Sequence, residues 1–397
     1  MSSASTACGP RCAKSALADS PRGVAAAGLL ALAVAIGIGR FAFTPLLPMM
    51  QDDAGLSVAD GGWLASANYA GYLLGALAAM AIPVRAGAAI RAGLLAIGAA
   101  TLAMGFERRF LPWAVLRAVA GVASAFVLIH VSAWSLARLA RQNRPWLTGV
   151  VFAGVGTGIA CAGLLCIVLM RGAVTSAAAW IVFGTLSFLV SAATWRTFAA
   201  TAAAPPAAEP GARAFGRHGG GAALVLAYGA LGFGYIIPAT FLPAMARALV
   251  RDPAVFGWSW PVFGVAAAAS TVFAAMLPPA MSDRRLLIAS LAVMALGVAL
   301  PVLLPGLTGI LLAALLVGGT FMVATMAGLK EARAAAVDRP ARLMAAMTAA
   351  FAAGQIAGPV AVSFLAGAGD QMGVALLAAC TLLVVGACAL VRGRRTP

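Results

Sequence analysis

Residues 37–48 read GIGRFAFTPLLP. They close a long apolar run that begins near Val24, so we predict that the guanidinium group of Arg40 is carried on a membrane-spanning helix. An ionisable group at such a depth is costly and indicates a functional site. The two glycines allow a neighbouring helix or a ligand to approach the backbone closely, and the two prolines indicate a helix end or a kink.

The composition excludes a soluble protein. Of 397 residues, 63% are hydrophobic and 10% are charged, with a mean hydropathy of +0.99. The 27 lysines and arginines outnumber 11 acids, but no basic helix stands apart from the apolar runs, so we reject nucleic-acid binding. Cys8 and Cys12 have no histidine nearby, and we expect neither a metal nor a cofactor. The ATP-binding loop and the hydrolase serine elbow are absent from the sequence, so we do not expect an enzyme.

Twelve apolar runs are long enough to be spanning helices, which predicts an all-α membrane protein. We place them at residues 24–49, 61–82, 88–106, 110–138, 145–170, 177–198, 221–246, 253–279, 286–305, 307–332, 342–367 and 371–391.

The organisation follows from these runs. We expect a cytoplasmic tail over 1–23, a six-helix bundle over 24–198, a linker over 199–220, a second bundle over 221–391 and a tail over 392–397. The linker is rich in Ala, Pro and Gly and cannot build a core.

Loop charges predict the orientation. If the N-terminus is cytoplasmic, the basic residues of the outer segments are Arg108, Arg109, Arg171, Arg247 and Arg251. All the others lie in cytoplasmic segments, except Arg40 and Arg117, which lie within spans. Positive charge favours the inside, so both termini are predicted to be cytoplasmic.

The two halves repeat. Gly232-Phe233-Gly234-Tyr235 follows Gly37-Ile38-Gly39-Arg40 by 195 residues, and Gly257-Trp258 follows Gly62-Trp63 by the same number. Gly154 and Gly158 recur after 200 residues as Gly354 and Gly358. Six-helix halves in the same orientation indicate parallel repeats related by a pseudo-two-fold axis along the membrane normal, as in the major facilitator fold.

Three segments resemble the YbfB/YjiJ group of the major facilitator superfamily: residues 37–48, residues 61–75 and residues 354–359, which read GQIAGP. The resemblance implies a twelve-helix secondary transporter of the bacterial inner membrane. Arg117 and Gly121 are similar to the superfamily motif whose arginine is linked to proton coupling. The loop over residues 83–87 lacks the acid of another superfamily motif, whereas its counterpart keeps Asp283.

Four polar residues on four spans fall in one layer. Arg40 lies about 15 Å below the outer surface and Arg117 about 10 Å deep, at 1.5 Å per residue. Asn68 is expected at a similar depth on its span, and Tyr235 is the repeat equivalent of Arg40. Both arginines are expected to line a central cavity, where guanidinium groups suit a carboxylate or phosphate.

Each of these assignments has a structural alternative. Arg40 can extend its head to the outer surface, and Arg117 can be a buried residue bonded to carbonyl groups. Arg117 can also serve coupling, which leaves Arg40 alone to meet the solute. Tyr69 and Gln355 are further candidates for binding, together with Tyr72 and Tyr228, although tyrosine also favours membrane interfaces.

Three other features bear on mechanism. His130 is a candidate proton carrier, because its ordinary pKa lies near neutrality, but a packing histidine is the equal alternative. Asp283 is expected to begin no helix and to latch onto the start of the fifth span, near Arg144-Pro145-Trp146. Trp258 and Trp260 are expected to sit in an interfacial belt.

The sequence therefore predicts a monomeric secondary transporter for a small organic solute. The two arginines favour an anion, and protons are a possible coupling ion. The alternatives are drug or sugar efflux by proton antiport and, in a different class, a transporter-like membrane receptor or sensor.

Overall fold

The computed structural model describes residues 20–144, 146–199, 219–276, 282–335, 340–365 and 371–393. Within these ranges every regular element is a helix, as the apolar runs predict. Most of the expected tail over 1–23, most of the linker over 199–220, the end of the tail over 392–397 and Pro145 lie outside the described residues.

The first apolar run forms three consecutive helical segments, α2 (Pro21–Leu32), the π-helix η1 (Ala33–Phe41) and α3 (Phe43–Asp53). The other elements are α4 (Val58–Ala81), α5 (Ala86–Met104), α6 (Phe110–Arg141), α7 (Leu147–Arg171), α8 (Ser176–Ala199), α9 (Gly219–Leu249), α10 (Pro253–Phe256), α11 (Ser259–Met276), α12 (Asp283–Leu303), α13 (Leu307–Ala335), α14 (Pro340–Leu365) and α15 (Gln371–Arg392).

Local sequence explains several helix starts. The Ser20 hydroxyl accepts a hydrogen bond from the Gly23 N–H at 3.1 Å, and Pro21 occupies the first turn, where its missing N–H costs nothing. At α4, Ser57 and Asp60 form a capping box in which each side chain bonds the other's backbone N–H.

Eleven helices are long and apolar enough to cross a membrane, counted over the described residues. The helix α4 is not among them, although it has 24 residues and packs between α6 and α14. Its apolar run is interrupted by Asp60, Asn68, Tyr69 and Tyr72. Length and apolarity thus support eleven of the twelve predicted spans among the described residues, and Asn68, Tyr69 and Tyr72 of the remaining one belong to the candidate site described below.

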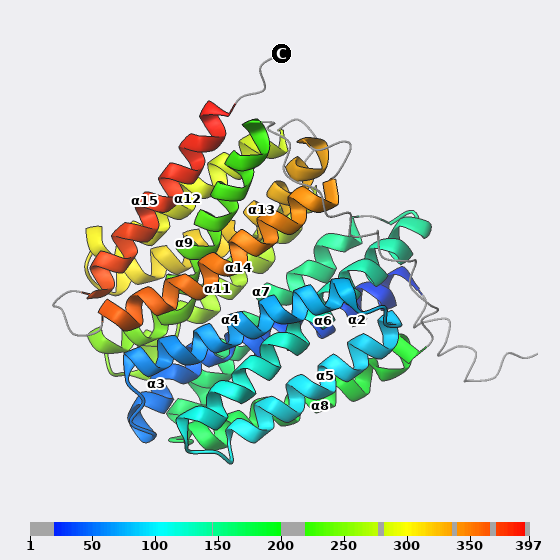
Figure 1. The fold of residues 1–397 in the computed structure, drawn as a ribbon. Coiled ribbons are helices and arrows are strands. Elements are labelled where there is room, and N and C mark those ends of the chain that lie inside the picture. The colour runs from blue at the N-terminus through cyan, green and yellow to red at the C-terminus, as the bar shows by residue number, and fades with distance from the viewer. Residues whose placement is uncertain are drawn as a thin grey trace, which may run out of the picture.

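Neighbouring helices in the first half recur in the second. In the first half α4 packs on α6, α5 on α6 and α8, and α2 on α7. The corresponding pairs of the second half are also in contact: α11 with α13, α12 with α13 and α15, and α9 with α14. Figure 1 shows the helices from α2 to α8 toward the lower right and those from α9 to α15 toward the upper left.

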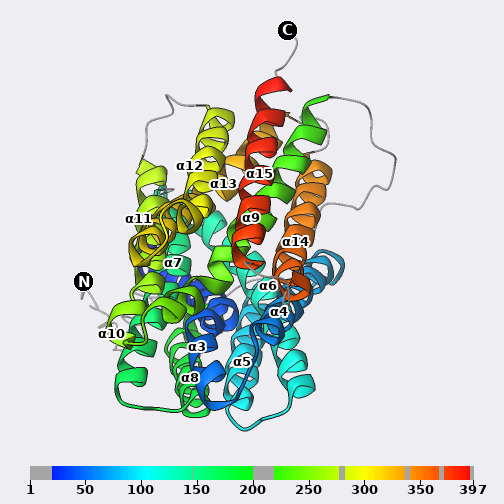
Figure 2. The same cartoon turned by 90° about the vertical axis from the view of Figure 1, so that its left-hand side faces the viewer.

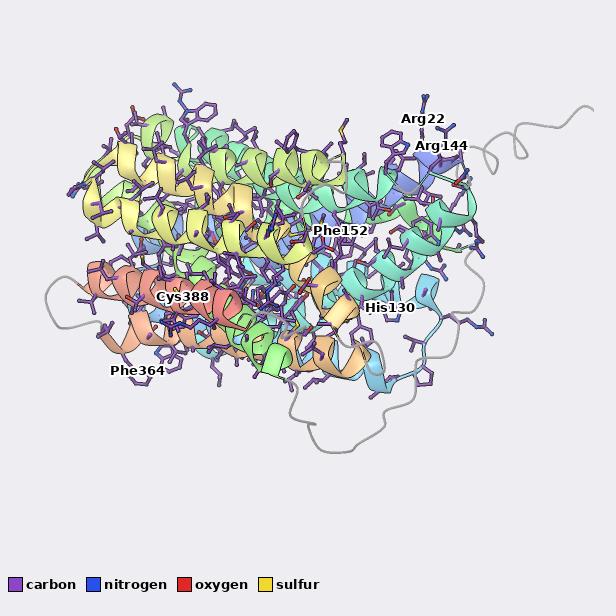
Figure 3. All side chains as sticks on the ribbon, turned by 90° about the horizontal axis from the view of Figure 1, so that it is seen from above. Arg22, His130, Arg144, Phe152, Phe364 and Cys388 are labelled. Atoms are coloured by element: carbon purple, nitrogen blue, oxygen red, sulfur yellow. The ribbon has the colours of Figure 1, made fainter. Side chains whose placement is uncertain are left out.

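The most extensive contacts between these two sets are those of α7 with α11, α4 with α14, and α3 with α9. Figure 2 shows α3 and α9 approaching each other from the two sets. We call the end of the molecule where α3 ends and α4 begins the Asp52 end. In Figure 3, Arg22 and Arg144 lie at the opposite end from Phe364, and His130 lies nearer to the two arginines.

Glycine lets the helices approach each other closely. A Cβ atom on Gly75 would lie 2.5 Å from the carbonyl oxygen of Val122 in α6. A Cβ atom on Gly37 in η1 would lie 2.5 Å from the Cα atom of Gly158 in α7. Small residues therefore bring α4 close to α6, and η1 close to α7.

Candidate functional site

The π-helix η1 creates the site by exposing its carbonyl groups. Its turns are wider than those of an α-helix, and such segments are concentrated at functional sites. The Ser124 hydroxyl of α6 donates to the carbonyl oxygen of Ala35 at 2.6 Å. Polar side chains of the neighbouring helices thus bond backbone groups of η1, which carries Arg40 near its end.

Arg117 is bonded to this backbone. Its Nη2 donates to the carbonyl oxygen of Arg40 at 2.9 Å, its Nη1 to that of Gly39 at 3.4 Å, and its guanidinium carbon lies 4.8 Å from the ring centre of Phe43. Asn68 supports the same turn, because its Nδ2 donates to the carbonyl oxygens of Gly39 at 3.1 Å and Arg117 at 2.8 Å. These bonds favour the structural alternative for Arg117, in which it fixes the turn that presents Arg40.

Arg40 is buried, with 4% of its surface exposed. Its guanidinium carbon lies 4.0 Å from the ring centre of Tyr72, 5.2 Å from that of Tyr69 and 5.3 Å from that of Phe41. Aromatic faces attract a cation, more strongly where water is excluded. Its Nε and Nη2 have no hydrogen-bond partner within the described ranges, so two donors stay open inside the protein.

The second half places Tyr235 and Gln355 beside this centre. The Gln355 Nε2 donates to the Tyr235 hydroxyl, and the Gln355 Oε1 has no partner among the described residues. The Tyr69 hydroxyl bonds the Thr240 hydroxyl at 3.1 Å, which links α4 to α9. Arg40 lies within electrostatic range of Tyr69 and Tyr235. The structure therefore brings together Arg40, Tyr69 and Tyr235 from both halves of the chain.

Trp260 corrects one prediction and adds a residue to the site. Both tryptophans were expected in an interfacial belt; Trp258 is 48% exposed, but Trp260 is fully buried. Its ring lies 6.0 Å from that of Phe41 and 4.9 Å from that of Phe263. It is buried because α11 packs face-on against α7, which the short spacing of the two tryptophans in sequence cannot indicate.

His130 makes a local contact. Its Nδ1 bonds the Phe126 carbonyl oxygen one turn earlier at 2.8 Å, and its ring stacks on that of Phe126 at 5.8 Å. Because a carbonyl only accepts, this nitrogen carries the proton. The contact favours the packing alternative.

The prediction that Asp283 begins no helix is wrong. Asp283 is the first residue of α12, because Ser282 caps that helix by accepting a hydrogen bond from the Arg285 N–H. No hydrogen bond or ion pair joins Asp283 to Arg144 in the part of the chain that the structure describes. The neighbouring Arg284, which sequence reasoning missed, lies 3.5 Å from Glu331 and donates to the carbonyl oxygens of Leu390 and Gly393.

The Asp52 end is held by contacts that the sequence analysis also missed. Asp52 at the end of α3 forms an ion pair with Arg247 at the end of α9. Thr44 donates to the carbonyl oxygen of Ala239 at 2.8 Å. In each of these two pairs the residues are 195 positions apart, which is the offset of the repeat. Applying that offset to the charged residues is the signal that finds the Asp52–Arg247 pair.

An apolar groove lies away from this cluster. It has a volume of about 470 Å³ and runs between α5 and α6, and its lining includes Val84, Gly93 and Phe126. Among the described residues, no group of three or more histidines, cysteines or acids stands close enough to hold a metal ion.

Comparison with known proteins agrees with this architecture. A mutant of the nucleoside transporter NupG, known from a crystal structure, superposes with a TM-score of 0.70 over 94% of this chain and 100% of that one, at 14% identity. At that identity the likeness concerns the fold. None of the curated proteins compared matches the chain. The family model described as "uncharacterised MFS-type transporter YbfB" matches residues 32–391. The chain therefore belongs to this family of major facilitator superfamily transporters, and it is a multi-pass membrane transporter rather than an enzyme.

Proposed function

We propose that the chain is a secondary transporter that moves a small anionic organic solute by alternating access, with Arg40 as the group that binds the anion. One observation carries the proposal: Arg40 is buried and keeps Nε and Nη2 unpartnered among the described residues. Leaving buried charged donors unpaired is costly. A carboxylate satisfies both donors at once, since the guanidinium fork bonds it in bidentate fashion.

The proposal assigns different roles to the two arginines. The guanidinium of Arg117 already has two carbonyl partners, whereas that of Arg40 is surrounded by aromatic rings. Arg117 and Asn68 thus hold the η1 turn, and Arg40 meets the solute. Tyr69, Tyr235 and Gln355 supply neutral hydrogen bonds beside it.

The architecture belongs to the same proposal. Residues 24–198 and 221–391 form two six-helix bundles related by a pseudo-two-fold axis, and they rock about the site between them. The matching helix neighbours of the two halves support this, as do the contacts between residues 195 positions apart. Such contacts are expected on the axis, where equivalent residues meet.

Orientation and state complete the proposal. Both termini are cytoplasmic in the bacterial inner membrane, and the protein acts as a monomer. The Asp52 end is then the outer side. Contacts across the halves at that end support an outer side that is shut: Asp52–Arg247, and Ser363, which donates to the Ala59 carbonyl oxygen at 2.9 Å.

Flux measurement tests the function. Purified protein is first screened for ligands by thermal shift with acids and their amides, since a ligand of the folded state raises its apparent stability. The best ligand is then loaded into proteoliposomes. A transporter exchanges it across the membrane and depends on its gradient or on a proton gradient. Binding without net movement would assign the chain to the receptor class instead.

A further inference from the structure

A connected row of aromatic side chains runs through the second half of the chain and leads to Arg40. Consecutive ring centres along it are 4.9 to 5.6 Å apart. The row comprises Trp260, Phe263, Phe321, Tyr235, Phe351 and Tyr228. It reaches Arg40 through Phe41, whose ring lies 6.0 Å from that of Trp260.

All four tyrosines of the chain belong to this centre. Tyr69 and Tyr72 hold the guanidinium of Arg40, and Tyr228 and Tyr235 are members of the row. A belt at the membrane surface would place them at the helix ends instead. Their gathering around one buried cation indicates a binding site.

Two hydrogen bonds join α4 to α14 on the side of the Asp52 end. Close contacts between these helices extend from the Ser363–Ala59 bond to the bond that Ser66 donates to the Ile356 carbonyl oxygen, at 3.2 Å. Further along both helices, toward the end that carries Arg144, the rings of Tyr72 and Phe351 are half-buried. Tyr72 contacts Arg40 and Phe351 contacts Tyr235, so these two half-buried rings connect the Arg40 centre to that side of the molecule.

The polar atoms left over at this place define the ligand further. Unpartnered donors among the described residues include Nε and Nη2 of Arg40 and Nε1 of Trp260, and the unpartnered acceptors include Oε1 of Gln355. Arg117 Nε and Asn68 Oδ1 are also unpartnered among the described residues, and the other side chains around Arg40 are mainly aromatic rings. This place therefore suits a compound with one acidic group and a flat apolar body.

We infer that the solute is a planar aromatic carboxylate, whose ring lies against Tyr72 and Phe351 and whose carboxylate binds Arg40. Aromatic neighbours prefer offset-stacked or edge-to-face partners, and such pairs add affinity beyond the area they bury. An aliphatic acid of similar size makes the same carboxylate contact but lacks the affinity that aromatic pairing adds. The inference rests on the proposed anion site and names the class of solute that the site takes.

The test compares three probes by isothermal titration of the purified full chain: benzoate, cyclohexanecarboxylate and benzamide. Aromatic pairing predicts that wild type binds benzoate about threefold to tenfold more tightly than cyclohexanecarboxylate. Phe351→Leu, which keeps an apolar side chain, reduces this ratio toward one, and Phe351→Tyr retains it. Phe273→Leu, which changes a phenylalanine that is 65% exposed on α11, leaves the ratio unchanged.

The outcomes separate this inference from the anion site. Equal binding of the two acids, both tighter than benzamide, overturns the aromatic class and leaves the anion site standing. Benzamide binding as tight as benzoate overturns the anion site itself. Failure of folded wild type to bind benzoate at all overturns the aromatic class.

Discussion

Thr44 donates a hydrogen bond of 2.8 Å to the carbonyl oxygen of Ala239, the residue that follows it by the 195-residue offset of the repeat. Asp52 and Arg247 form an ion pair across the same offset. In the proposed two-bundle architecture, a residue that meets its own repeat equivalent lies next to the pseudo-two-fold axis. The two contacts thus mark the line along which the first and seventh spans meet at the Asp52 end.

Breaking the Asp52–Arg247 pair is expected to open this end. The partners are 59% and 29% exposed, so the pair contributes at most about 1 kcal/mol, and Asp52→Asn shifts the ratio of open to closed states by up to about fivefold. Pulsed electron paramagnetic resonance between spin labels at Val58 and Leu249, in a cysteine-free chain, reports this as a larger population at long distance.

The charge-swapped variant Asp52→Arg with Arg247→Asp restores the wild-type distances. Glu107→Gln is the matched control, because Glu107 pairs with Arg109 within one loop at the same end. If Asp52→Asn leaves the distance distribution unchanged, the pair does not hold the Asp52 end.

Arg117 is expected to stabilise the fold more than it recognises the solute. Arg117→Gln leaves the Arg40 carbonyl group without its side-chain donor, while the Gly39 carbonyl group keeps the bond from Asn68; the loss costs roughly 1–3 kcal/mol and lowers the melting temperature. The preference for acids over amides stays as in wild type. Thermal unfolding and ligand titration measure the two effects, with exposed Arg108→Gln as control. Loss of the acid preference at unchanged stability would give Arg117 the role assigned to Arg40.

Close helix packing predicts opposite effects for two glycines. Gly75→Ala places a Cβ atom against the Val122 carbonyl and is expected to destabilise the protein by about 1–3 kcal/mol. Gly319 meets only the Ala266 Cβ atom at 4.0 Å, so Gly319→Ala gains up to about 1 kcal/mol of helix propensity. Thermal unfolding in one detergent compares them. Equal melting temperatures would mean that α4 and α6 are farther apart than described.

The contact of His130 with its own helix predicts a small effect on coupling. Its Nδ1 is held by the Phe126 carbonyl oxygen. His130→Gln is therefore expected to keep the wild-type dependence of transport on pH between about 5 and 8, the range in which a free histidine titrates. Proteoliposome flux at several pH values checks this. A flattened profile in the variant would identify His130 as the proton carrier.

The helices and the repeat were predictable, because apolar runs and a constant offset are properties of the sequence alone. The prediction of one polar layer named Arg40, Arg117, Asn68 and Tyr235, since a polar residue on an apolar run turns away from lipid, and it gave Tyr69 only as a further candidate. The π-helix was not predictable, because its wide turns depend on bonds from Arg117 and Asn68.

Burial of Trp260 and the Arg284–Glu331 pair were missed for a related reason. Both depend on which helices pack together, α7 with α11 and α12 with α13, and no local pattern contains that information. Asp283 was misplaced because the N-cap at Ser282 was not recognised.

Arg40 is the residue that we propose as the binding group for the anion. The most direct measurement is the ratio of affinities for an acid and its amide, determined by titration for wild type, Arg40→Gln and Arg40→Lys. We predict that wild type prefers the acid by at least about tenfold, that Arg40→Gln loses this preference, and that Arg40→Lys retains part of it, since lysine keeps the charge without the planar fork. An unchanged preference in a folded Arg40→Gln protein would contradict the account.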